Sequence, residues 1–298
     1  MEDSTPLRRS LLFVPASEPR KLERASTSEA DTLILDLEDA VPPAQKAEAR
    51  RRMIALVQSG GHGRSELVVR VNSLGSPAFQ DDLEAVVEAG VTTILLPKAD
   101  SAESVEFVVR KLEQVEGDAE REQQVRIIAL VESALGIVNA AALGRSTPRL
   151  DALCFGHVDF ASDMGLPHAE SSHGVVLQAR CTVAIAAKAS GLGAIDCVCL
   201  AIKDEMAFRE DAVLGAQLGY DGKLCVHPSQ VRFANEVYTP TPEQVEYAAR
   251  VIAGWRSAQS AGHAVFTIEG KMIDAPVVAS QERILARARR AGVGDDEL

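Results

Sequence analysis

Short apolar segments recur along the chain, and longer amphipathic segments separate them. Within the short segments the apolar residues are continuous, a pattern typical of parallel strands that are covered on both faces. The segments occupy residues 10–15, 32–37, 66–72, 92–98, 125–132, 151–156, 194–200 and 222–227. The sequence therefore predicts eight parallel strands.

The segments between these strands have the start and stop signals of helices. Residues 43–58 open with proline, which a first helical turn tolerates, and residues 77–90 close with glycine, a common helix end. Further helices are predicted over residues 101–116, 174–193 and 204–219. Repeated strand–helix units predict an α/β fold, the (β/α)8 TIM barrel. The rival is a doubly wound open sheet, which more often carries GxGxxG after an early strand, and the sequence has no such motif.

A different pattern follows the eighth predicted strand. A Thr-Pro-Thr-Pro segment precedes a long helix, a hairpin-like segment and a last helix. The eighth strand of a closed barrel already pairs with the first, so this extension cannot join the sheet and has to pack outside it. We predict a catalytic barrel domain over residues 1–238 and a C-terminal helical extension over residues 239–298.

Polar side chains gather where the predicted strands end. They are Asp36, Glu38 and Asp39 after the second strand, Arg70 on the third, Glu132 after the fifth and Asp159 after the sixth. The carboxyl ends of all eight strands meet on one face of a (β/α)8 barrel, and that face holds the chemistry. Carboxylates are costly to bury without a cation or a hydrogen-bond donor. We therefore expect these acids to surround cations.

Two of these acids have the character of metal ligands. Glu132 and Asp159 follow adjacent strands and can share one hard cation, with water and substrate oxygens completing the shell, as is typical of Mg2+. Each also has a structural interpretation, as a carboxylate near a helix start. Arg70 lies on the third predicted strand, beside the strand that ends in Asp36 and Glu38. It is either a structural counter-ion for these acids or a clamp for a substrate carboxylate or enolate. The residues predict a magnesium-dependent enzyme for an anionic, oxygen-rich small molecule.

Composition narrows the class of protein. The formal net charge of −12 argues against binding to nucleic acid or to an anionic membrane. No apolar run reaches the length of a membrane span, and the N-terminus lacks the layout of a signal peptide. The five cysteines form no CxxC pair, which predicts reduced thiols in a cytoplasmic protein, and the histidines lack zinc-site spacing.

Eight segments together carry a family resemblance. In chain order they are RRSLLFVPASEPRKLERA, DTLILDLEDAV, VVRVNSLGSP, ILLPKADSAESV, LVESALGI, CFGHVDFASDMG, LGYDGKLCVHPSQV and IEGKMIDAPVV. This set resembles the citrate lyase beta-subunit-like family of CoA-ester lyases, which includes malyl-CoA and citramalyl-CoA lyases within the HpcH/HpaI aldolase superfamily. The resemblance spans nearly the whole chain.

The resemblance implies an activity and a metal site. A magnesium-bound (β/α)8 barrel would reversibly cleave a 3-hydroxyacyl-CoA, such as citryl-, malyl- or citramalyl-CoA, to acetyl-CoA and a 2-oxo acid. Glu132 and Asp159 would be the metal ligands, and Arg70 would contact the oxo acid and the developing enolate. Glu38, with Asp39 nearby, would organise Arg70 and the water around the metal.

The resemblance also implies roles for residues away from the strand ends. Asp274 would be the catalytic acid or base, delivered by the C-terminal extension to the barrel of a neighbouring subunit. This arrangement requires a homo-oligomer, a trimer or hexamer by analogy. The alternative for Asp274 is an intrachain cap at a turn. Arg20 and Lys21 would contact the phosphates of CoA, and their alternative role is that of exposed cations at a helix start.

The chain departs from the family pattern at one important point. Where the family commonly has Gly-x-Glu-Asp, this chain has GHVD, so Val158 replaces a frequent glutamate and His157 precedes it. Ala16 also stands where a glycine often follows FVP. Asp159 is kept, so we expect the His157–Val158 pair to affect selection of the oxo acid more than the chemistry.

Three rival functions stay open at this stage. One is a CoA-independent aldolase for a hydroxy-oxo acid, which the extension with Asp274 disfavours. The second is a malate-synthase-like enzyme that also hydrolyses the thioester. The third is a non-catalytic subunit, which the set of Arg70, Glu132, Asp159 and Asp274 argues against. The residues leave open the identity of the oxo acid, the physiological direction and membership of a larger lyase complex.

Overall fold

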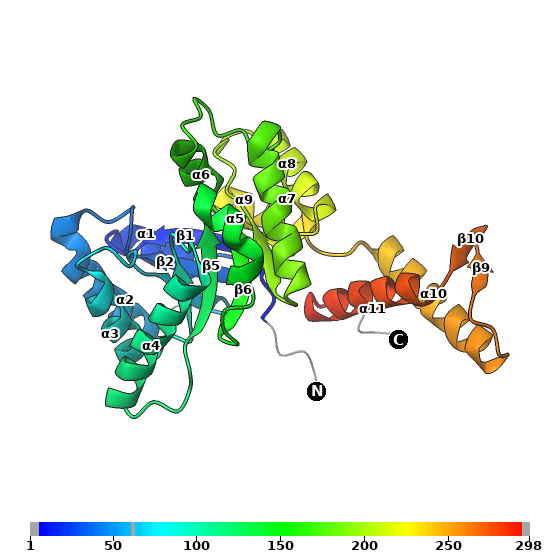
Figure 1. Ribbon diagram of the computed structural model, residues 1–298, viewed down its shortest axis with the longest axis horizontal. Helices are drawn as coiled ribbons and strands as arrows, with labels where there is room; N and C mark the ends of the chain where they lie inside the picture. Colours follow the sequence, from blue (N-terminus) through cyan, green and yellow to red (C-terminus); the bar gives the residue numbers. More distant parts are fainter. Residues whose placement is uncertain (1–5, 61–62, 294–298) are drawn as a thin grey trace. The chain divides into compact units, whose positions relative to one another are not determined.

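Eight parallel strands close into a barrel in the computed structural model, which describes residues 6–60 and 63–293. Each strand pairs with the next in the chain, and β8 closes the ring by pairing with β1. Figure 1 labels four of these strands, β1, β2, β5 and β6, and several of the helices around them. The predicted barrel is confirmed, and the rival open sheet is excluded. The strands are β1 (Ser10–Pro15), β2 (Thr32–Asp36), β3 (Glu66–Arg70), β4 (Thr93–Leu96), β5 (Arg126–Val131), β6 (Leu150–Phe155), β7 (Gly193–Asp196) and β8 (Gly222–Cys225).

The interior of the barrel is a packed apolar core. Every strand contributes at least one buried side chain to it, because successive residues of a strand point to opposite faces. The core residues are Leu11, Ile34, Val68, Leu95, Ile128, Leu130, Ala152, Cys154, Ile195 and Leu224. The outward-facing residues are buried too, which explains the continuous apolar runs of the sequence.

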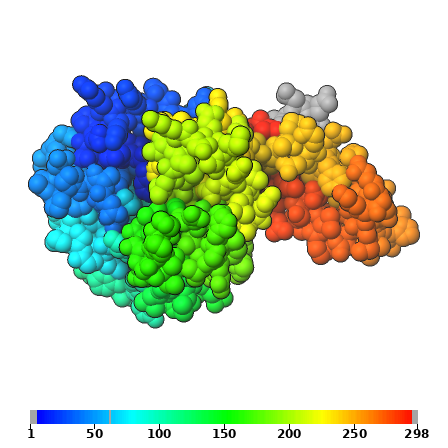
Figure 2. Space-filling view, turned by 90° about the horizontal axis from the view of Figure 1, so that it is seen from above, coloured from blue at the N-terminus to red at the C-terminus, as the bar shows by residue number. Residues whose placement is uncertain are grey.

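Helices surround the barrel in chain order. Figure 2 shows this ring, with the colours running from blue through cyan and green to yellow around the barrel unit. The helical elements are α1 (Pro19–Ala25), the short 3-10 helix η1 (Pro43–Gln45), α2 (Lys46–Gln58), α3 (Phe79–Ala89), α4 (Ala102–Asp118), α5 (Ala134–Leu143), α6 (His157–Asp163), α7 (Gly174–Ala189), α8 (Glu205–Gln217) and α9 (Pro228–Val237).

Local sequence signals set several helix ends. Ser101 caps α4 through a reciprocal capping box with Ser104, so two backbone N–H groups gain acceptors. α3 ends where Gly90 adopts a left-handed backbone with φ of 81°, a conformation that glycine enters without steric cost. The predicted helix over residues 43–58 begins as the 3-10 turn η1, with Pro43 as its first residue.

The C-terminal extension is a compact unit of its own. Contacts divide the chain into Met1–Glu236 and Val237–Leu298. The second unit has two helices, α10 (Pro242–Ser260) and α11 (Ala275–Arg290), and the antiparallel pair β9 (Phe266–Ile268) and β10 (Lys271–Ile273). Its apolar core includes Ala248, Val251, Ile273, Val278 and Leu285.

The two predicted domains extend to residues 1 and 298, and residues 1–5 and 294–298 lie outside the described residues. No helix within residues 6–60 and 63–293 combines the length and apolarity that crossing a bilayer requires.

Candidate active site

A cavity of about 420 Å3 opens at the carboxyl ends of the strands. Its volume lies in the range of small-molecule sites. Polar side chains predicted from the strand ends line it together, although they are far apart in the sequence. They are Asp36, Asp39, Arg70, Glu132 and Asp159.

Arg70 lies at the centre of the acidic side of this cavity. Its Nε and Nη2 donate to the two carboxylate oxygens of Asp36, at 2.8 and 2.7 Å. Its Nη1 approaches Glu38 at 3.3 Å and Asp39 at 3.6 Å. Burial acts to lower the pKa of Arg70, but the hydrogen bonds and charge of Asp36 outweigh it and raise that pKa. The three acids that follow β2 therefore surround a permanently charged guanidinium.

Two further residues hold Arg70 in place. The guanidinium lies over the ring of Phe13, 4.9 Å from its centroid, a cation–π contact from β1. Asp36 is fixed in turn because it accepts the backbone N–H of Glu38 at 2.8 Å. The planar fork of Arg70 is thus oriented before any substrate arrives, with Nη1 as the nitrogen least committed to the protein.

Glu38 is a buried acid between two cations. Burial raises its pKa, while the nearby charge of Arg70 opposes the shift. One carboxylate oxygen accepts the Nζ of Lys98 at 3.3 Å, and the other lacks a hydrogen-bond partner within the described residues. Lys46 supports the same turn, since its Nζ donates to the carbonyl of Glu38 at 3.0 Å. That second oxygen of Glu38 is the one that faces Nη1 of Arg70 at 3.3 Å, so this acid is held between Lys98 and Arg70.

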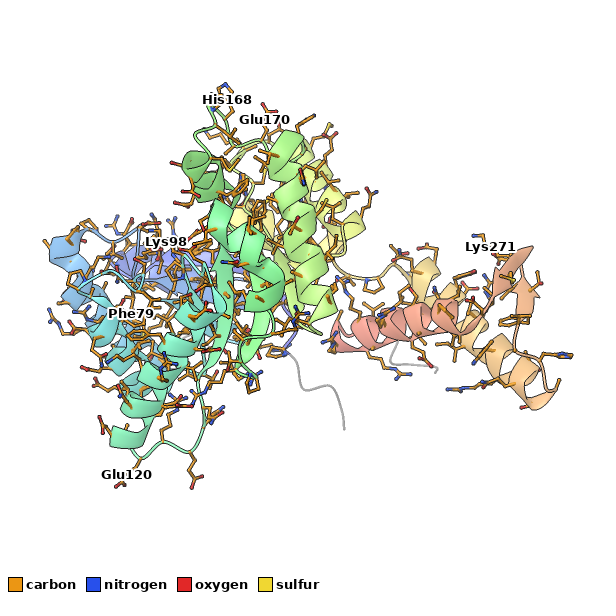
Figure 3. The ribbon with its side chains drawn as sticks, viewed as in Figure 1. Phe79, Lys98, Glu120, His168, Glu170 and Lys271 are labelled. Atoms are coloured by element: carbon orange, nitrogen blue, oxygen red, sulfur yellow. The ribbon has the colours of Figure 1, made fainter. Side chains whose placement is uncertain are left out.

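Glu132 directly follows β5 and is almost completely buried. Its Oε1 accepts the backbone N–H of Lys98 at 2.8 Å. Lys98, labelled in Figure 3, has a positive φ of 51°, which is uncommon for a residue other than glycine. Burial raises the pKa of Glu132 to about 8, and the charge of Asp159 adds to the shift. This carboxylate lacks the cation that would keep it ionised at neutral pH.

The turn after β6 is shaped around Glu132. A Cβ at Gly156 would lie 2.6 Å from the Cβ of Glu132 and 2.7 Å from its Oε2, so any side chain there would clash. Asp159 lies three residues further, in the first turn of α6, and faces the same cavity. Gly156 thus leaves room for Glu132 beside Asp159.

These acids fit a divalent cation. Around the cavity, the carboxylates of Asp36, Glu38, Asp39, Glu132 and Asp159 face the cations of Arg70 and Lys98. Five acids against two cations leave an excess of three negative charges when all are ionised. The donors are all hard oxygens, and the acid with the least compensation, Glu132, is one of the two predicted ligands. This chemistry matches Mg2+.

The other side of the cavity is apolar. Its lining there consists of Leu130, Phe155, Val158, Val198, Leu224 and Val226. His157 also borders the cavity, and its ring packs against Phe155 with centroids 6.5 Å apart. Burial and the charge of Lys223 lower the pKa of His157 to about 4, so the imidazole is neutral at pH 7. Its Nδ1 is buried without a hydrogen-bond partner among the described residues.

Four predicted site residues are not part of this cavity lining. Glu38 is buried behind it, where it pairs with Arg70 at 3.3 Å. Arg20 and Lys21 are exposed on α1, and Lys21 pairs with Glu18 at 2.7 Å. Asp274 belongs to the C-terminal unit, where it is the N-cap of α11 and accepts the N–H of Val277 at 3.2 Å. A capping role for Asp274 is therefore present.

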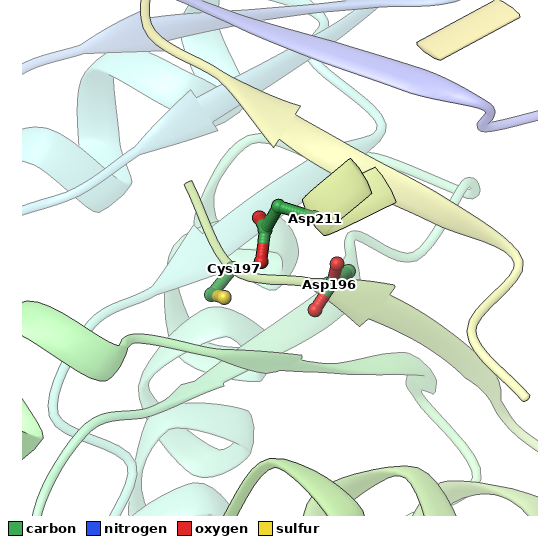
Figure 4. A group of neighbouring side chains, drawn as sticks. All are labelled: Asp196, Cys197 and Asp211. Carbon is green, nitrogen blue, oxygen red and sulfur yellow. The ribbon is translucent and has the colours of Figure 1, made fainter. Parts of the chain in front are cut away.

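A second group of potential metal ligands lies outside the cavity lining. Ligand atoms of Asp196, Cys197 and Asp211 lie within 4.8 Å of one another (Figure 4). Cations already occupy this group: Arg180 bonds Asp196 at 2.6 Å and Asp211 at 2.8 Å, and Lys223 contacts the same two acids at 2.9 and 2.5 Å. Two acids and two cations balance, so this is a structural ion cluster between β7, β8 and their helices.

Sequence reasoning assigned no role to Phe13 or Lys98. It named Asp36 and Glu38 together as neighbours of Arg70, without indicating that Asp36 binds two nitrogens of that guanidinium. In the sequence Phe13 is an ordinary apolar strand residue. The residues around it do not indicate its contact with Arg70, which is 57 positions away. Lys98 ends the fourth predicted strand, and nothing in the local sequence indicates its positive φ. The interactions that fix the site thus come from β1 and β4 as well as from the acids.

Comparisons with known proteins agree on one family. The HpcH/HpaI aldolase/citrate lyase family matches residues 9–228. Citrate lyase subunit beta of Leuconostoc mesenteroides subsp. cremoris is 36% identical over 296 residues, covering 98% of this chain and 96% of that protein. Mitochondrial citramalyl-CoA lyase of Rattus norvegicus is 32% identical over 291 residues, covering 94% of this chain and 86% of that protein.

A solved structure agrees in fold and in sequence. The protein CitE from Mycobacterium tuberculosis, in complex with magnesium, acetoacetate and coenzyme A, is 34% identical to this chain. The TM-score is 0.77, and the match covers 98% of this chain and all of that one. A protein of the same fold therefore binds the metal that the acids of this cavity fit.

Proposed function

The chain belongs to the HpcH/HpaI aldolase/citrate lyase family, and we propose that it cleaves a 3-hydroxyacyl-CoA into acetyl-CoA and a 2-oxo acid with the aid of Mg2+. The predicted family, the carbon–carbon lyase class and magnesium as cofactor are confirmed at this level. The observation that carries the proposal is one cavity that Glu132 and Asp159 line together with a preoriented Arg70.

Glu132 and Asp159 are the residues that would hold the metal. When bound there, Mg2+ supplies a Lewis acid that favours the carbonyl over the hydroxyl form of the oxo-acid half. Glu38 pairs with Arg70 through one oxygen and holds Lys98 through the other, and the backbone of Lys98 fixes Glu132. The acids thus define where the oxygens of the oxo acid bind.

Arg70 would stabilise the charge that develops on the other half of the substrate. Cleavage breaks the bond between the hydroxyl-bearing carbon and the CH2 next to the thioester. The hydroxyl proton passes to a carboxylate of the cavity as the carbonyl forms, and the electron pair of the broken bond passes into a thioester enolate. Two nitrogens of Arg70 are bound to Asp36, which leaves Nη1 to donate to the enolate oxygen. Because Asp36 and Phe13 orient the largely buried guanidinium in advance, such a donor acts strongly in the transition state.

Asp274 would complete the reaction by giving a proton to the enolate carbon, which becomes the methyl group of acetyl-CoA. In the condensation direction the same carboxylate removes that proton. This role rests on the resemblance of the GKMIDAP segment, as does delivery to a neighbouring subunit in a trimer or hexamer. Arg20 and Lys21 are exposed cations that could meet the phosphates of CoA. The cytoplasmic location stays a prediction.

A panel of citryl-, malyl- and citramalyl-CoA tests the proposed function. With Mg2+, we expect at least one ester to yield acetyl-CoA and its 2-oxo acid, and chelation to stop the reaction. Free CoA without acetyl-CoA would indicate thioester hydrolysis after condensation. Cleavage of a free hydroxy-oxo acid alone would indicate an aldolase. If the folded protein turned over none of these compounds, the remaining interpretation would be a non-catalytic subunit.

Replacing Arg70 by lysine keeps the positive charge but loses the planar guanidinium. A lysine cannot bind both oxygens of Asp36 and at the same time offer a further nitrogen to the substrate. We expect kcat to fall by a factor that corresponds to about 2–4 kcal/mol, the usual effect of losing one oxyanion donor. Steady-state kinetics on the best ester measure the loss. Arg64→Lys, on an exposed arginine before β3, is the control with unchanged kinetics. Near-normal turnover by the Arg70 variant would reduce Arg70 to a structural counter-ion.

A further inference from the structure

The cavity has two chemically different sides, and they impose different demands on the substrate. One side carries the acids and Arg70, and the other carries six apolar side chains. The oxo-acid half of the substrate needs its first carboxylate and its oxo oxygen on the acidic side, at the metal. Whatever the oxo acid carries beyond these groups must therefore lie against the apolar side.

The apolar side comes from four neighbouring elements at the carboxyl end of the barrel. Leu130 lies on β5, Phe155 on β6 and Leu224 on β8, while Val158 lies in the first turn of α6. Phe155 is fully buried, and Val158 is 38% exposed. Where the family pattern has a glutamate, this chain therefore presents an isopropyl group at the edge of the cavity.

The described part of the chain offers no uncommitted cation in the cavity lining to neutralise a second carboxylate, and Lys98, outside the lining, pairs with Glu38 at 3.3 Å. Among the described residues that line the cavity, Arg70 is the single lysine or arginine. Its charge is already shared by Asp36, Glu38 and Asp39. His157, the other nitrogen-bearing side chain of the lining, is 3% exposed and packs against the ring of Phe155.

The local charge balance strengthens this argument. The mouth holds an excess of acids that one divalent cation does not fully offset. A second substrate carboxylate would lose water, meet valine and leucine side chains, and lie near Asp159 and Glu132 without a partner. Burying an unpaired charge is far costlier than the loss of a methyl contact. A methyl group, by contrast, gains from contact with the same side chains.

We propose that the 2-oxo acid of this enzyme has one carboxylate and a methyl-sized apolar substituent. This inference rests on the proposed lyase function. The matching CoA ester is citramalyl-CoA. The ester with an extra carboxylate in this position, citryl-CoA, is the poorest of the panel, and malyl-CoA, which lacks the methyl group, lies between them. The chain thus differs in substrate from relatives that are named for citrate.

The test compares kcat/KM for the three esters with the full-length protein and saturating Mg2+, each ester supplied as a mixture of stereoisomers. We expect citramalyl-CoA to exceed citryl-CoA by at least about tenfold, the scale that poor fit of one group produces. A kcat/KM for citryl-CoA equal to or above that for citramalyl-CoA overturns the inference and leaves the lyase function standing. Failure of all three esters contradicts the lyase function itself.

Val158→Arg tests the apolar side directly by placing a cation on it. We expect the citryl-to-citramalyl ratio of kcat/KM to rise by about fivefold or more, because the guanidinium can pair with the second carboxylate. Val138→Arg is the matched control, since Val138 is 82% exposed on α5 and does not line the cavity. A ratio unchanged in a folded Val158→Arg variant contradicts the assignment of this side to the substituent.

Discussion

Glu132→Gln lowers magnesium-dependent cleavage by about a thousandfold, because several kcal/mol of transition-state stabilisation depend on the metal. Glutamine has nearly the same shape, and its side-chain oxygen can still accept the N–H of Lys98, so the turn after β5 keeps its structure. The variant loses only the negative charge that binds the cation. Turnover at limiting and saturating Mg2+ measures the effect, and thermal unfolding checks that the barrel is intact.

The matched control for this prediction comes from a neighbouring acid. Asp163 lies at the end of α6, where it accepts the N–H of Ala134 at 2.7 Å, and it does not line the cavity. Asp163→Asn should leave the magnesium dependence unchanged, while Asp159→Asn should behave like Glu132→Gln. If Glu132→Gln kept full activity at low Mg2+, the metal site would have to lie elsewhere.

The raised pKa of Glu132 predicts how magnesium binding depends on pH. With a pKa of about 8 in the metal-free protein, Glu132 is mostly protonated at pH 7, and only its ionised form binds the metal. Binding should therefore release close to one proton at pH 7 and less as the pH rises above 8. Calorimetry at pH 7 in two buffers with different ionisation enthalpies measures the released proton, and Glu132→Gln should abolish it.

The sequence was sufficient for the fold because the fold rests on local patterns. Eight continuous apolar runs, helix-ending glycines and capping residues such as Ser101 each act over a few positions. The carboxyl ends of all strands of such a barrel lie on one face, so the sequence alone places Arg70, Glu132 and Asp159 on that face. The grouping of the acids around one cation followed from the cost of burying charge.

The parts that could not be predicted depend on contacts between distant strands. Nothing near Phe13 indicates that its ring lies under Arg70, and nothing near Lys98 indicates that its backbone N–H points at Glu132. The need for glycine at position 156 appears only when β5 and β6 are side by side, because the clash is with Glu132. Such contacts are set by the register of the barrel rather than by local sequence.

Asp274→Asn should lower turnover by about a hundredfold to ten-thousandfold, the usual contribution of a general acid or base. Asparagine is as good an N-cap as aspartate, so it can still accept the N–H of Val277 and keep the start of α11. The substitution therefore separates the two roles of the residue. A stable variant with near-normal turnover would leave Asp274 with the capping role alone.

Where Asp274 acts can be decided by mixing two inactive variants. The C-terminal unit that carries it exposes apolar side chains, with Met272 68% and Val265 51% exposed, which are suited to contact with another subunit. Asp274→Asn and Glu132→Gln proteins are dissociated together and reassembled, and subunit exchange is verified by mass spectrometry of tagged chains. If each site takes its barrel from one subunit and Asp274 from the next, random exchange makes about a quarter of the sites complete. Activity should then return toward a quarter of the wild-type level, whereas an Asp274 that serves its own barrel gives no recovery, because every chain lacks one of the two residues.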